Sequence, residues 1–373
     1  MKPKYEMIKE YILESVKSGM FPSGMMIPSE SDFCRLFKVS RISVRKAIDE
    51  LVLREILYRR QGKGTFVANR GPLKQALVND QKIGILLPFY SEFTEGILSG
   101  ISKELSNHGY FYKVLQTYGR QSLEHQKLAD YDRDGVRGII LLTTFCDESE
   151  KNLSVYINRK IPIVFVDRFI ENWPFDAVVG KDYEAGFQAV QHLYENHHVR
   201  RIGFFSSELQ KVTSVSNRLQ GTIDAIQRYG LTARESALCL TLAVGANSPM
   251  NQNLDRKELK DSIQRFLNQN DDCEAVILSN DLTAAFFLNV CQSNNIKVPE
   301  ELKLISFMND EYSTLTVPRL TTFDQNLNEL GKLAAKQVIT RIKTGGEGEK
   351  ELVEVPYNLI IRESCGCTHI RGK

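Results

Sequence analysis

A cluster of basic side chains near the N-terminus has the residue types and spacing that suit contact with a nucleic acid. Arg41, Ser43, Arg45 and Lys46 lie on the exposed N-terminal side of a predicted helix over residues 41–54. Arg41 and Arg45 are four residues apart and share one helix face, so both guanidinium groups can enter a DNA major groove together. An isolated group of arginines is more often a solvated face, and the surrounding elements must decide between these interpretations.

The surrounding residues predict a helix-turn-helix followed by a β-wing. Ser29 and Ser40 are suitable N-caps for its second and third helices. Gly62-Lys63-Gly64 predicts a tight hairpin with a cation at its tip. A recognition helix beside a basic wing favours DNA binding, because phosphates attract cations and guanine edges pair with arginine. We expect the helices over residues 4–18, 29–37 and 41–54, and the strands over 57–60 and 65–67.

The charge of the 373-residue chain is divided unevenly along its length. The net charge is only +2, from 48 basic and 46 acidic residues. Residues 1–75 carry 15 basic and 8 acidic residues, a net charge of +7, and the remainder carries a net charge of −5. A basic head on an acidic body indicates two functions, one of which faces a polyanion.

The body, from residue 82 onward, alternates short apolar runs with helical stretches. This alternation is typical of parallel sheets in an α/β architecture, and its length suits two lobes. Ligands of such sheets lie at the carboxyl ends of the strands. We expect strands over residues 83–87, 112–115, 138–142, 163–166, 177–179, 201–205, 237–240, 275–278, 303–307 and 320–323, and helices over 93–108, 182–196, 216–229, 257–269 and 282–294.

The head resembles the GntR-type winged helix-turn-helix family. The resemblance rests on three segments, 28–32, 39–47 and 61–67. It implies that Arg41 and Arg45 reach guanine edges, that Lys4 and Ser40 contact phosphates, and that the wing enters or straddles the minor groove. Glu30 either accepts from cytosine or holds Arg41 in a salt bridge. The operator-binding residues are predicted as Lys4, Glu30, Arg35, Ser40, Arg41, Ser43, Arg45, Lys46, Gln61, Gly62, Lys63 and Gly64.

The body resembles the regulatory domain of the lactose/galactose-repressor family, which is similar to periplasmic sugar-binding proteins. Short motifs carry this resemblance, among them Ile161–Arg168, Arg218–Gly221, Ser279–Asp281 and Pro318–Gln325. It implies a fold of two Rossmann-like lobes with the effector between them. Fixed carboxylate, amide and guanidinium groups are what the recognition of buried hydroxyls requires. The implied effector residues are Phe89, Tyr90, Phe93, Thr143, Thr144, Asp167, Arg218, Asn280, Asp281, Asn309 and Gln325.

Two positions in this set leave alternatives open. Asn280 and Asp281 precede a predicted helix, and we expect Asp281 to cap that helix while Asn280 binds the effector. The family usually has an Asp-Asp pair after the strand over 303–307, and its first Asp falls on Met308 here. Either Asn309 or Asp310 replaces it, or the site makes one fewer polar contact.

The combination of the two modules is similar to that of arabinose-utilisation repressors. It implies a DNA-binding domain over residues 1–68, a linker over 69–80, and an effector-binding and dimerisation domain over 81–373. The resemblance implies a cytoplasmic homodimer that binds double-stranded operator DNA and is released by a monosaccharide, with L-arabinose as the leading candidate. Another aldose, a uronate or a sugar phosphate, or activation in place of repression, remains an alternative.

Other classes of function find little support in the sequence. The common hydrolase and nucleotide-triphosphatase motifs are missing, and we expect neither an enzyme nor a cofactor. The chain has no apolar run of about 18 residues, so we expect no membrane span. Seven scattered cysteines fit reduced thiols in a cytoplasm. Cys365-Gly366-Cys367-Thr368-His369 could bind a metal only with a fourth ligand and an ordered tail, and we expect no metal there.

Overall fold

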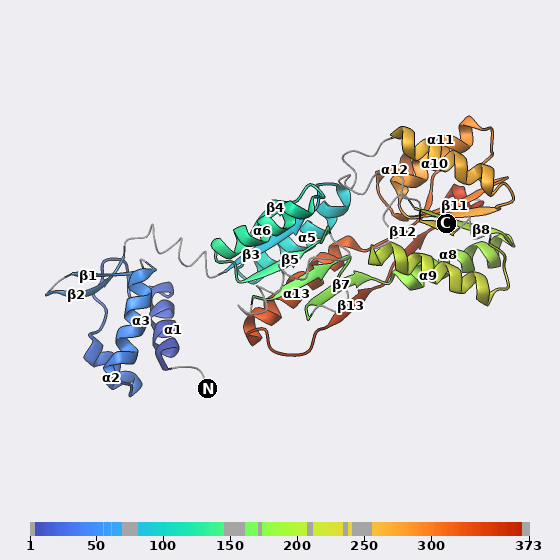
Figure 1. The fold of residues 1–373 in the computed structure, drawn as a ribbon. Helices are drawn as coiled ribbons and strands as arrows, with labels where there is room; N and C mark the ends of the chain where they lie inside the picture. The colour runs from blue at the N-terminus through green and yellow to red at the C-terminus, as the bar shows by residue number, and fades with distance from the viewer. Residues whose placement is uncertain are drawn as a thin grey trace, which may run out of the picture. The chain divides into compact units, whose positions relative to one another are not determined.

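The computed structural model describes residues 4–54, 56–60, 62–68, 81–144, 161–170, 174–206, 212–233, 238–240 and 256–367. The chain divides into two compact units, Met1–Lys82 and Ile83–Lys373 (Figure 1). The predicted linker over residues 69–80, the wing residue Gln61 and the tail residue His369 lie outside the described residues.

The head has the predicted winged helix-turn-helix architecture. Its helices are α1 (Lys4–Lys17), α2 (Glu30–Phe37) and α3 (Arg41–Leu53), and its wing is the antiparallel pair β1 (Leu57–Arg60) and β2 (Gly64–Val67). The core is formed by one apolar stripe from each helix, including Ile12, Phe33 and Ile48. Ser29 and Asp32 form a capping box at α2, and the Ser40 hydroxyl accepts from the Ser43 amide at α3. Both predicted N-caps are therefore confirmed.

The first lobe of the body is a six-stranded sheet covered on both faces. The strand order is β13-β7-β6-β5-β3-β4. Residues that alternate along the strands point to opposite faces, as in Ile139 and Ile140 of β5. One face packs against α5 and α13, and the other against α6. The elements are β3 (Lys82–Leu87), α5 (Glu92–Asn107), β4 (Phe111–Gln116), α6 (Gln121–Arg133), β5 (Gly138–Leu141), β6 (Ile163–Val166), β7 (Asp176–Gly180), α13 (Leu327–Thr344) and β13 (Leu352–Val355).

The second lobe repeats this design. Its strand order is β14-β12-β11-β10-β8-β9, with α8 and α9 packed on one face and α10 and α11 on the other. All ten predicted body strands are present, each within one residue of its expected bounds. The elements are α8 (Asp182–His197), β8 (Ile202–Ser206), α9 (Thr213–Arg228), β9 (Leu238–Leu240), α10 (Arg256–Gln269), β10 (Ala275–Leu278), α11 (Asp281–Ser293), β11 (Lys303–Met308), α12 (Glu311–Leu315), β12 (Thr321–Asp324), β14 (Asn358–Ile360) and the 3-10 turn η2 (Glu363–Cys365).

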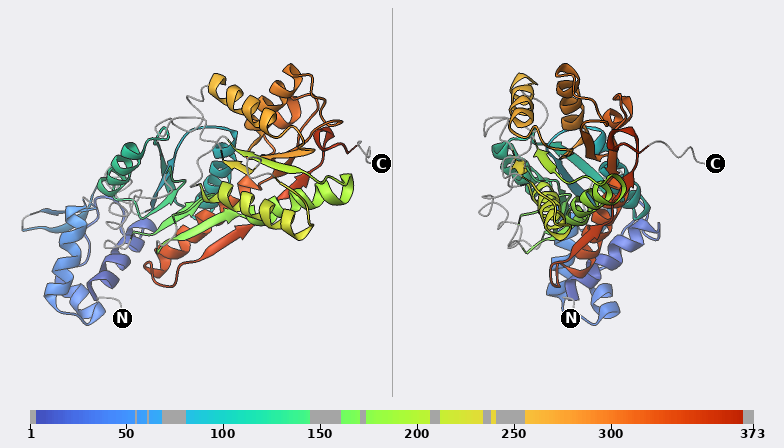
Figure 2. Two further views of the ribbon diagram at one scale, coloured as in Figure 1. Left: turned by 45° about the vertical axis from the view of Figure 1, so that its right-hand side comes forward. Right: turned by 90° about the vertical axis from the view of Figure 1, so that its right-hand side faces the viewer.

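Within the described part of the body, the chain passes between the lobes three times. The crossings join β7 to α8, β12 to α13, and β13 to β14. Figure 1 shows α13 and β13 beside β7 in the first lobe and β12 with β11 in the second, and Figure 2 shows the same division from two other sides. The first and third crossings are joined by a hydrogen bond from the Lys181 amide to the Val355 carbonyl, 2.9 Å long.

In each lobe, one pair of helices crosses at glycine. In the first lobe, Gly100 of α5 and Gly331 of α13 each lie against the backbone of the partner helix. In the second lobe, Gly186 of α8 and Gly221 of α9 do the same. A Cβ atom on Gly331 would lie 2.0 Å from the Ile97 carbonyl oxygen. Only a hydrogen atom fits there, and each glycine fixes the separation of its helix pair.

We therefore predict that Gly331→Ala destabilises the protein, although alanine is favoured over glycine in helices by about 1 kcal/mol. The clash with backbone should outweigh that gain and cost about 1–3 kcal/mol or more. Urea unfolding of the full chain measures the effect. Lys336→Ala, an exposed change on the same helix, is the control and should be nearly neutral. A Gly331→Ala variant as stable as the control would contradict this packing.

Candidate operator interface and effector site

The recognition helix α3 presents its two arginines at its N-terminal end, where both side chains are mostly exposed. Arg41 Nε lies 3.1 Å from Glu30 Oε2, and Arg45 Nε lies 3.8 Å from Glu30 Oε1. Arg59 of β1 reaches the same carboxylate at 3.8 Å and Asp49 at 2.6 Å. Of the two roles expected for Glu30, the structure shows the salt bridge to Arg41. Exposed pairs of this kind are weak, and the guanidinium groups remain available to another anion.

The wing keeps its glycines and its cation exposed. Gly62 and Gly64 have φ values of 73° and 122°, and the Lys63 amide donates to the Arg60 carbonyl at 2.9 Å. The Arg60 guanidinium lies 5.5 Å from the ring centroids of both Tyr58 and Phe66. The hairpin therefore projects Lys63 from a base that Arg60 and the two rings stabilise.

The remaining predicted operator residues have several local partners. Lys4 is exposed at the start of α1. The Ser40 and Ser43 hydroxyls lie 3.1 Å apart at the start of α3. Lys46 Nζ lies 4.1 Å from the centroid of the Tyr5 ring. Arg35 pairs with Asp32 at 2.6 Å, and hydrogen bonds from Ser29, followed by that pair, lower the pKa of Asp32. Their contacts with DNA stay predictions.

The body buries a network of charged groups where the first and third crossings meet α9. Arg218 Nε donates to Asp182 Oδ1 at 2.7 Å, and Arg218 Nη1 donates to the Ser279 carbonyl at 2.9 Å. The Tyr357 hydroxyl donates to Asp182 Oδ1 at 3.0 Å. Burial raises the pKa of Asp182 to about 7, against the opposing effect of Arg218. The predicted effector residue Arg218 is therefore held in the second lobe, beside the first and third crossings.

Asp167 joins this region from the end of β6. It is buried, and Arg168 Nε donates to it at 2.9 Å. Its φ of 69° is unusual for a residue other than glycine, and a strained backbone of this kind is often kept at ligand sites. Its charge also raises the pKa of Asp182. The sequence predicts both Asp167 and Arg218 as effector ligands, and the charges of both act on the same buried carboxylate, Asp182.

A second buried network surrounds Asp281 of α11. Its carboxylate accepts from the Ser306 hydroxyl at 2.5 Å, the Thr322 hydroxyl at 2.7 Å and the Asp310 amide at 3.0 Å. Burial raises the pKa of both Asp281 and Asp310. Asn309 donates to Asp324 at 3.2 Å and accepts from Arg362 at 2.6 Å.

The expectation that Asp281 caps α11 is wrong, and the binding of an effector by Asn280 stays a prediction. Asn280 is the N-cap of α11, and its Oδ1 accepts from the Thr283 amide at 2.8 Å. Asp281 follows it, and its side chain is held by groups from β11 and β12. Both residues are good N-caps, and only the donors that other strands supply decide which of them is used. Asp310 likewise caps α12, where it accepts from the Tyr312 amide.

The predicted aromatic and threonine ligands fall into different environments. Phe93 is part of the core of the first lobe, and Phe89 is also buried, whereas Tyr90 is 55% exposed. Thr143 and Thr144 both bond to the buried carboxylate of Glu124, through the Thr143 hydroxyl at 2.9 Å and the Thr144 amide at 2.7 Å. Tyr90 is therefore the accessible aromatic of this set.

Gln325 lies at the second crossing and is 1% exposed. Its Oε1 atom is a buried acceptor without a hydrogen-bond partner among the described residues. A buried carbonyl oxygen left unpaired is costly, so this atom is suited to receive a hydroxyl from a ligand or water.

The site residues predicted from the sequence do not include Glu124, Asp182, Arg168 and Tyr357. Asp182 and Arg168 adjoin predicted elements, and a carboxylate three residues after the predicted strand over 177–179 was a usable signal for Asp182. Glu124 and Tyr357 gave no local signal, because their burial depends on distant elements. Four side chains that could hold a metal ion, His192, His197, Cys365 and Cys367, form a separate group beside α8.

Comparisons with known proteins support both modules. Residues 4–67 match the family of bacterial regulatory proteins of the gntR type, and residues 190–365 match a periplasmic binding protein-like domain. The arabinose metabolism transcriptional repressor of Halalkalibacterium halodurans is 27% identical over 98% of this chain and 97% of its own length. That of Geobacillus stearothermophilus is 28% identical over 97% of each chain.

A solved structure supports the fold of the body. The transcription regulator CcpA of Lactococcus lactis superposes with a TM-score of 0.65 at 21% identity, covering 76% of this chain and 99% of that one. The comparisons confirm the predicted fusion of a GntR-type head with a periplasmic-binding-protein-like body. These similar proteins are named as transcriptional regulators. Within the described residues, no helix is both long and apolar enough to cross a membrane.

The Glu124 carboxylate generates a testable pH dependence. Burial raises its pKa from 4.5 to about 7, so the folded protein binds this proton more tightly than the unfolded chain does. That stabilisation is fully present below pH 4.5 and is lost as the pH rises through 7. Glu124→Gln cannot ionise, and its amide oxygen can accept from the Thr144 amide while its NH2 donates to the Thr143 hydroxyl. We predict that, relative to wild type, it gains up to about 3 kcal/mol in unfolding free energy between pH 5 and pH 8.

Urea unfolding at pH 5, 6, 7 and 8 measures this difference. Glu95→Gln, an exposed change on α5, is the matched control and should run parallel to wild type. A Glu124→Gln profile that also runs parallel to wild type would show that Glu124 is ionised in the folded protein.

Proposed function

We propose that this DNA-binding transcriptional regulator, with its GntR-type head and periplasmic-binding-protein-like body, is a cytoplasmic homodimeric repressor that a monosaccharide releases from its operator. The monosaccharide we propose is L-arabinose. The observation that carries the proposal is the pairing of two exposed arginines on a recognition helix with buried carboxylate, guanidinium and amide groups at the crossings between the two lobes. The similarity to two arabinose metabolism repressors extends over both modules.

On the DNA side, the head presents positively charged side chains from the recognition helix and from the wing. Arg41 and Arg45 share a face of α3 and are held by Glu30 at its edge, where a phosphate or a guanine edge can replace the carboxylate. Lys63 extends from the wing to a neighbouring groove. Two heads in a dimer would read the two half-sites of a pseudo-palindrome.

On the sugar side, the charges favour a neutral ligand. Arg168 faces Asp167 and Arg218 faces Asp182, so each of these guanidinium groups already lies beside a carboxylate. A sugar phosphate would instead require cations that converge on it. The available groups form a mixed set of donors and acceptors, to which the unpaired Gln325 oxygen belongs, and such a set matches the hydroxyls of a polyol. Tyr90 supplies an accessible ring for the apolar face of the sugar.

We expect sugar binding to affect operator binding through the three crossings that join the lobes. Hydrogen bonds also join the lobes away from the crossings, among them the Phe169 amide to Thr213 Oγ1 at 3.4 Å and the Glu311 amide to Glu92 Oε2 at 3.0 Å. A sugar that binds the closed arrangement more tightly shifts the population toward it and changes how the paired heads are held. Operator affinity then falls by the differential affinity of the sugar, about 1–3 kcal/mol.

Fluorescence polarisation of a labelled operator, titrated with the full-length protein, tests the proposal. Adding L-arabinose should weaken operator binding by about 5–150-fold, and a panel of other aldoses, uronates and sugar phosphates should weaken it less. Asp167→Asn should keep operator affinity and lose the response, since it removes a charged acceptor. The model is wrong if every sugar leaves operator affinity unchanged while one of them binds the body. A sugar that strengthens operator binding would instead indicate an activator.

Arg45→Ala separates reading of bases from attraction to phosphates. We predict a loss of about 1–3 kcal/mol per half-site for the operator and little change in sugar affinity. Arg54→Ala removes the same charge at the other end of α3 and serves as the control. Competition with a scrambled duplex measures specificity. An Arg45→Ala variant that still prefers the operator as strongly as wild type would remove Arg45 from direct base recognition.

A further inference from the structure

Two histidines and two cysteines from distant parts of the chain meet in the second lobe. His192 and His197 lie in the last turns of α8, and Cys365 and Cys367 lie at and after η2, some 170 positions later in the chain. One potential ligand atom from each residue lies within 4.8 Å of the other three. Cys367 Sγ lies 3.2 Å from His197 Nε2 and 3.8 Å from His192 Nε2. This group plays no part in the operator interface or the effector site.

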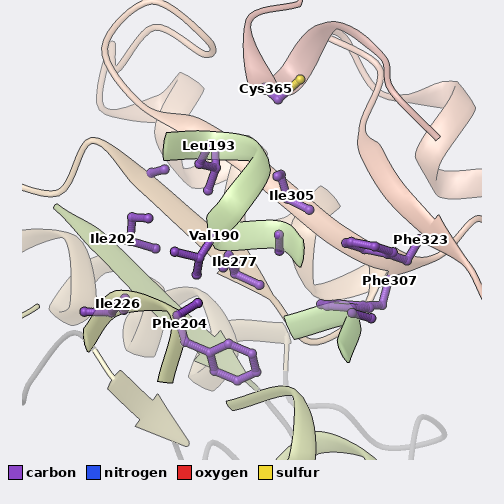
Figure 3. Packing of buried hydrophobic residues seen from close by; sticks show 14 of the residues in the cluster. Val190, Leu193, Ile202, Phe204, Ile226, Ile277, Ile305, Phe307, Phe323 and Cys365 are labelled. Atoms are coloured by element: carbon purple, nitrogen blue, oxygen red, sulfur yellow. The ribbon is translucent and has the colours of Figure 1, made fainter. Parts of the chain in front are cut away.

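The local structure explains why these side chains converge. Cys365 is fully buried in the core of the second lobe, which also contains Leu193 of α8 and Ile305 of β11 (Figure 3). Gly366 follows with a φ of 91°, a left-handed turn that lets the two flanking cysteines approach the same helix. A Cβ atom on Gly366 would lie 3.6 Å from the His197 ring. The segment Cys365-Gly366-Cys367 is therefore packed closely against α8.

The donor set matches one class of metal ion. Two thiols and two imidazoles form the ligand set of closed structural zinc sites. With Zn–S distances of about 2.3 Å and Zn–N distances of about 2.0 Å, the ligand atoms of a tetrahedron lie about 3.3–3.8 Å apart. A sulfur–nitrogen pair in such a tetrahedron is about 3.5 Å apart, and the two sulfur–nitrogen distances in the structure, 3.2 and 3.8 Å, lie on either side of that value. The 4.8 Å limit on the other pairs requires only small side-chain movements.

The surroundings of the histidines also suit a metal. His192 is buried and His197 is partly buried, so both rings are largely shielded from water. An imidazole binds a cation through the lone pair of one ring nitrogen in its neutral form. A His192 ring that binds a cation through Nε2 carries its proton on Nδ1, and that N–H must donate to an acceptor. The Asn196 side-chain NH2 lies 3.4 Å from Nδ1, so the Asn196 amide has to turn its oxygen toward the ring when the cation binds.

We propose that His192, His197, Cys365 and Cys367 form a structural site for zinc or a closely related thiophilic cation. The ion ties the C-terminal segment after β14 to the end of α8. Because four protein side chains complete the tetrahedron, the site has no open position for a substrate and serves stability in place of catalysis. The expectation that the C-terminal cysteines form an ordinary tail did not anticipate α8, whose two histidines supply the additional ligands.

Metal content and cobalt spectroscopy of the full-length protein test the site. After reduction, chelation and reconstitution, the wild type should retain about one zinc per chain on gel filtration, as a four-ligand site predicts. Cobalt should give thiolate-to-metal charge-transfer absorption and the intense visible bands of a tetrahedral complex. Zinc should also raise the melting temperature of the wild type.

Cys367→Ser and His197→Gln are the test variants, because both side chains are only partly buried, whereas Cys365 is fully buried and its replacement could prevent folding. Each should weaken zinc binding by at least about 100-fold, beyond the 10–100-fold typical of outer-shell changes. Each should also abolish the charge-transfer band or alter it, and lose the zinc-dependent rise in melting temperature. Cys273→Ser, in the same lobe but outside the group, should behave as wild type.

Three results would overturn the proposal. The first is a reduced, folded wild type that takes up no zinc. The second is equal loss of zinc from Cys273→Ser and Cys367→Ser. The third is an intact mass showing that Cys365 and Cys367 are joined in a disulfide in protein purified without oxidant and that this form resists reduction.

Discussion

The buried ion pair between Arg218 and Asp182 is the interaction on which the arrangement of the body depends. Arg218 reaches from α9 to the first crossing and to the Ser279 carbonyl at the end of β10, while Tyr357 brings the third crossing to the same carboxylate. Gly180 leaves the space for Tyr357, since a Cβ atom there would lie 1.8 Å from its hydroxyl oxygen. Removing one partner would leave a buried charge uncompensated, at a cost of about 3–5 kcal/mol. Arg218 therefore holds the body together in addition to any contact that it makes with a ligand.

This constraint concentrates relative motion of the lobes at the crossings. Each lobe has a core on both faces of its sheet and a helix pair in contact at glycine, so neither can deform easily. The crossings are also linked to one another. Asn326 donates to the Pro356 carbonyl at 2.6 Å, and Asn358 donates to Asn326 at 3.4 Å. A ligand that displaces one crossing must move the others, and this requirement favours a rigid-body response over a local one.

Local signals were sufficient for most of the fold. Strands such as Ile163–Val166 are buried on both faces and therefore read as continuous apolar runs. Two described strands that the sequence did not predict, β13 and β14, are short, lie at sheet edges and carry polar residues such as Glu354 and Asn358, which weaken that signal. Ser29 was predictable as a cap because the partner Asp32 lies three residues away.

The site was less predictable because its chemistry depends on partners from distant segments. Asp281 resembles a cap until Ser306 and Thr322 are seen to donate to it, and Thr143 resembles a free ligand until Glu124 is seen beside it. In the head, Glu30 is a partner of this kind for the two arginines of the recognition helix, but its contacts with them are exposed and weak. Glu30 binds Arg41 and Arg45 through exposed contacts worth about 0–1 kcal/mol each, whereas a bidentate contact with guanine is worth about 1–3 kcal/mol. Glu30 can therefore position both arginines in the free protein and still release them to the operator.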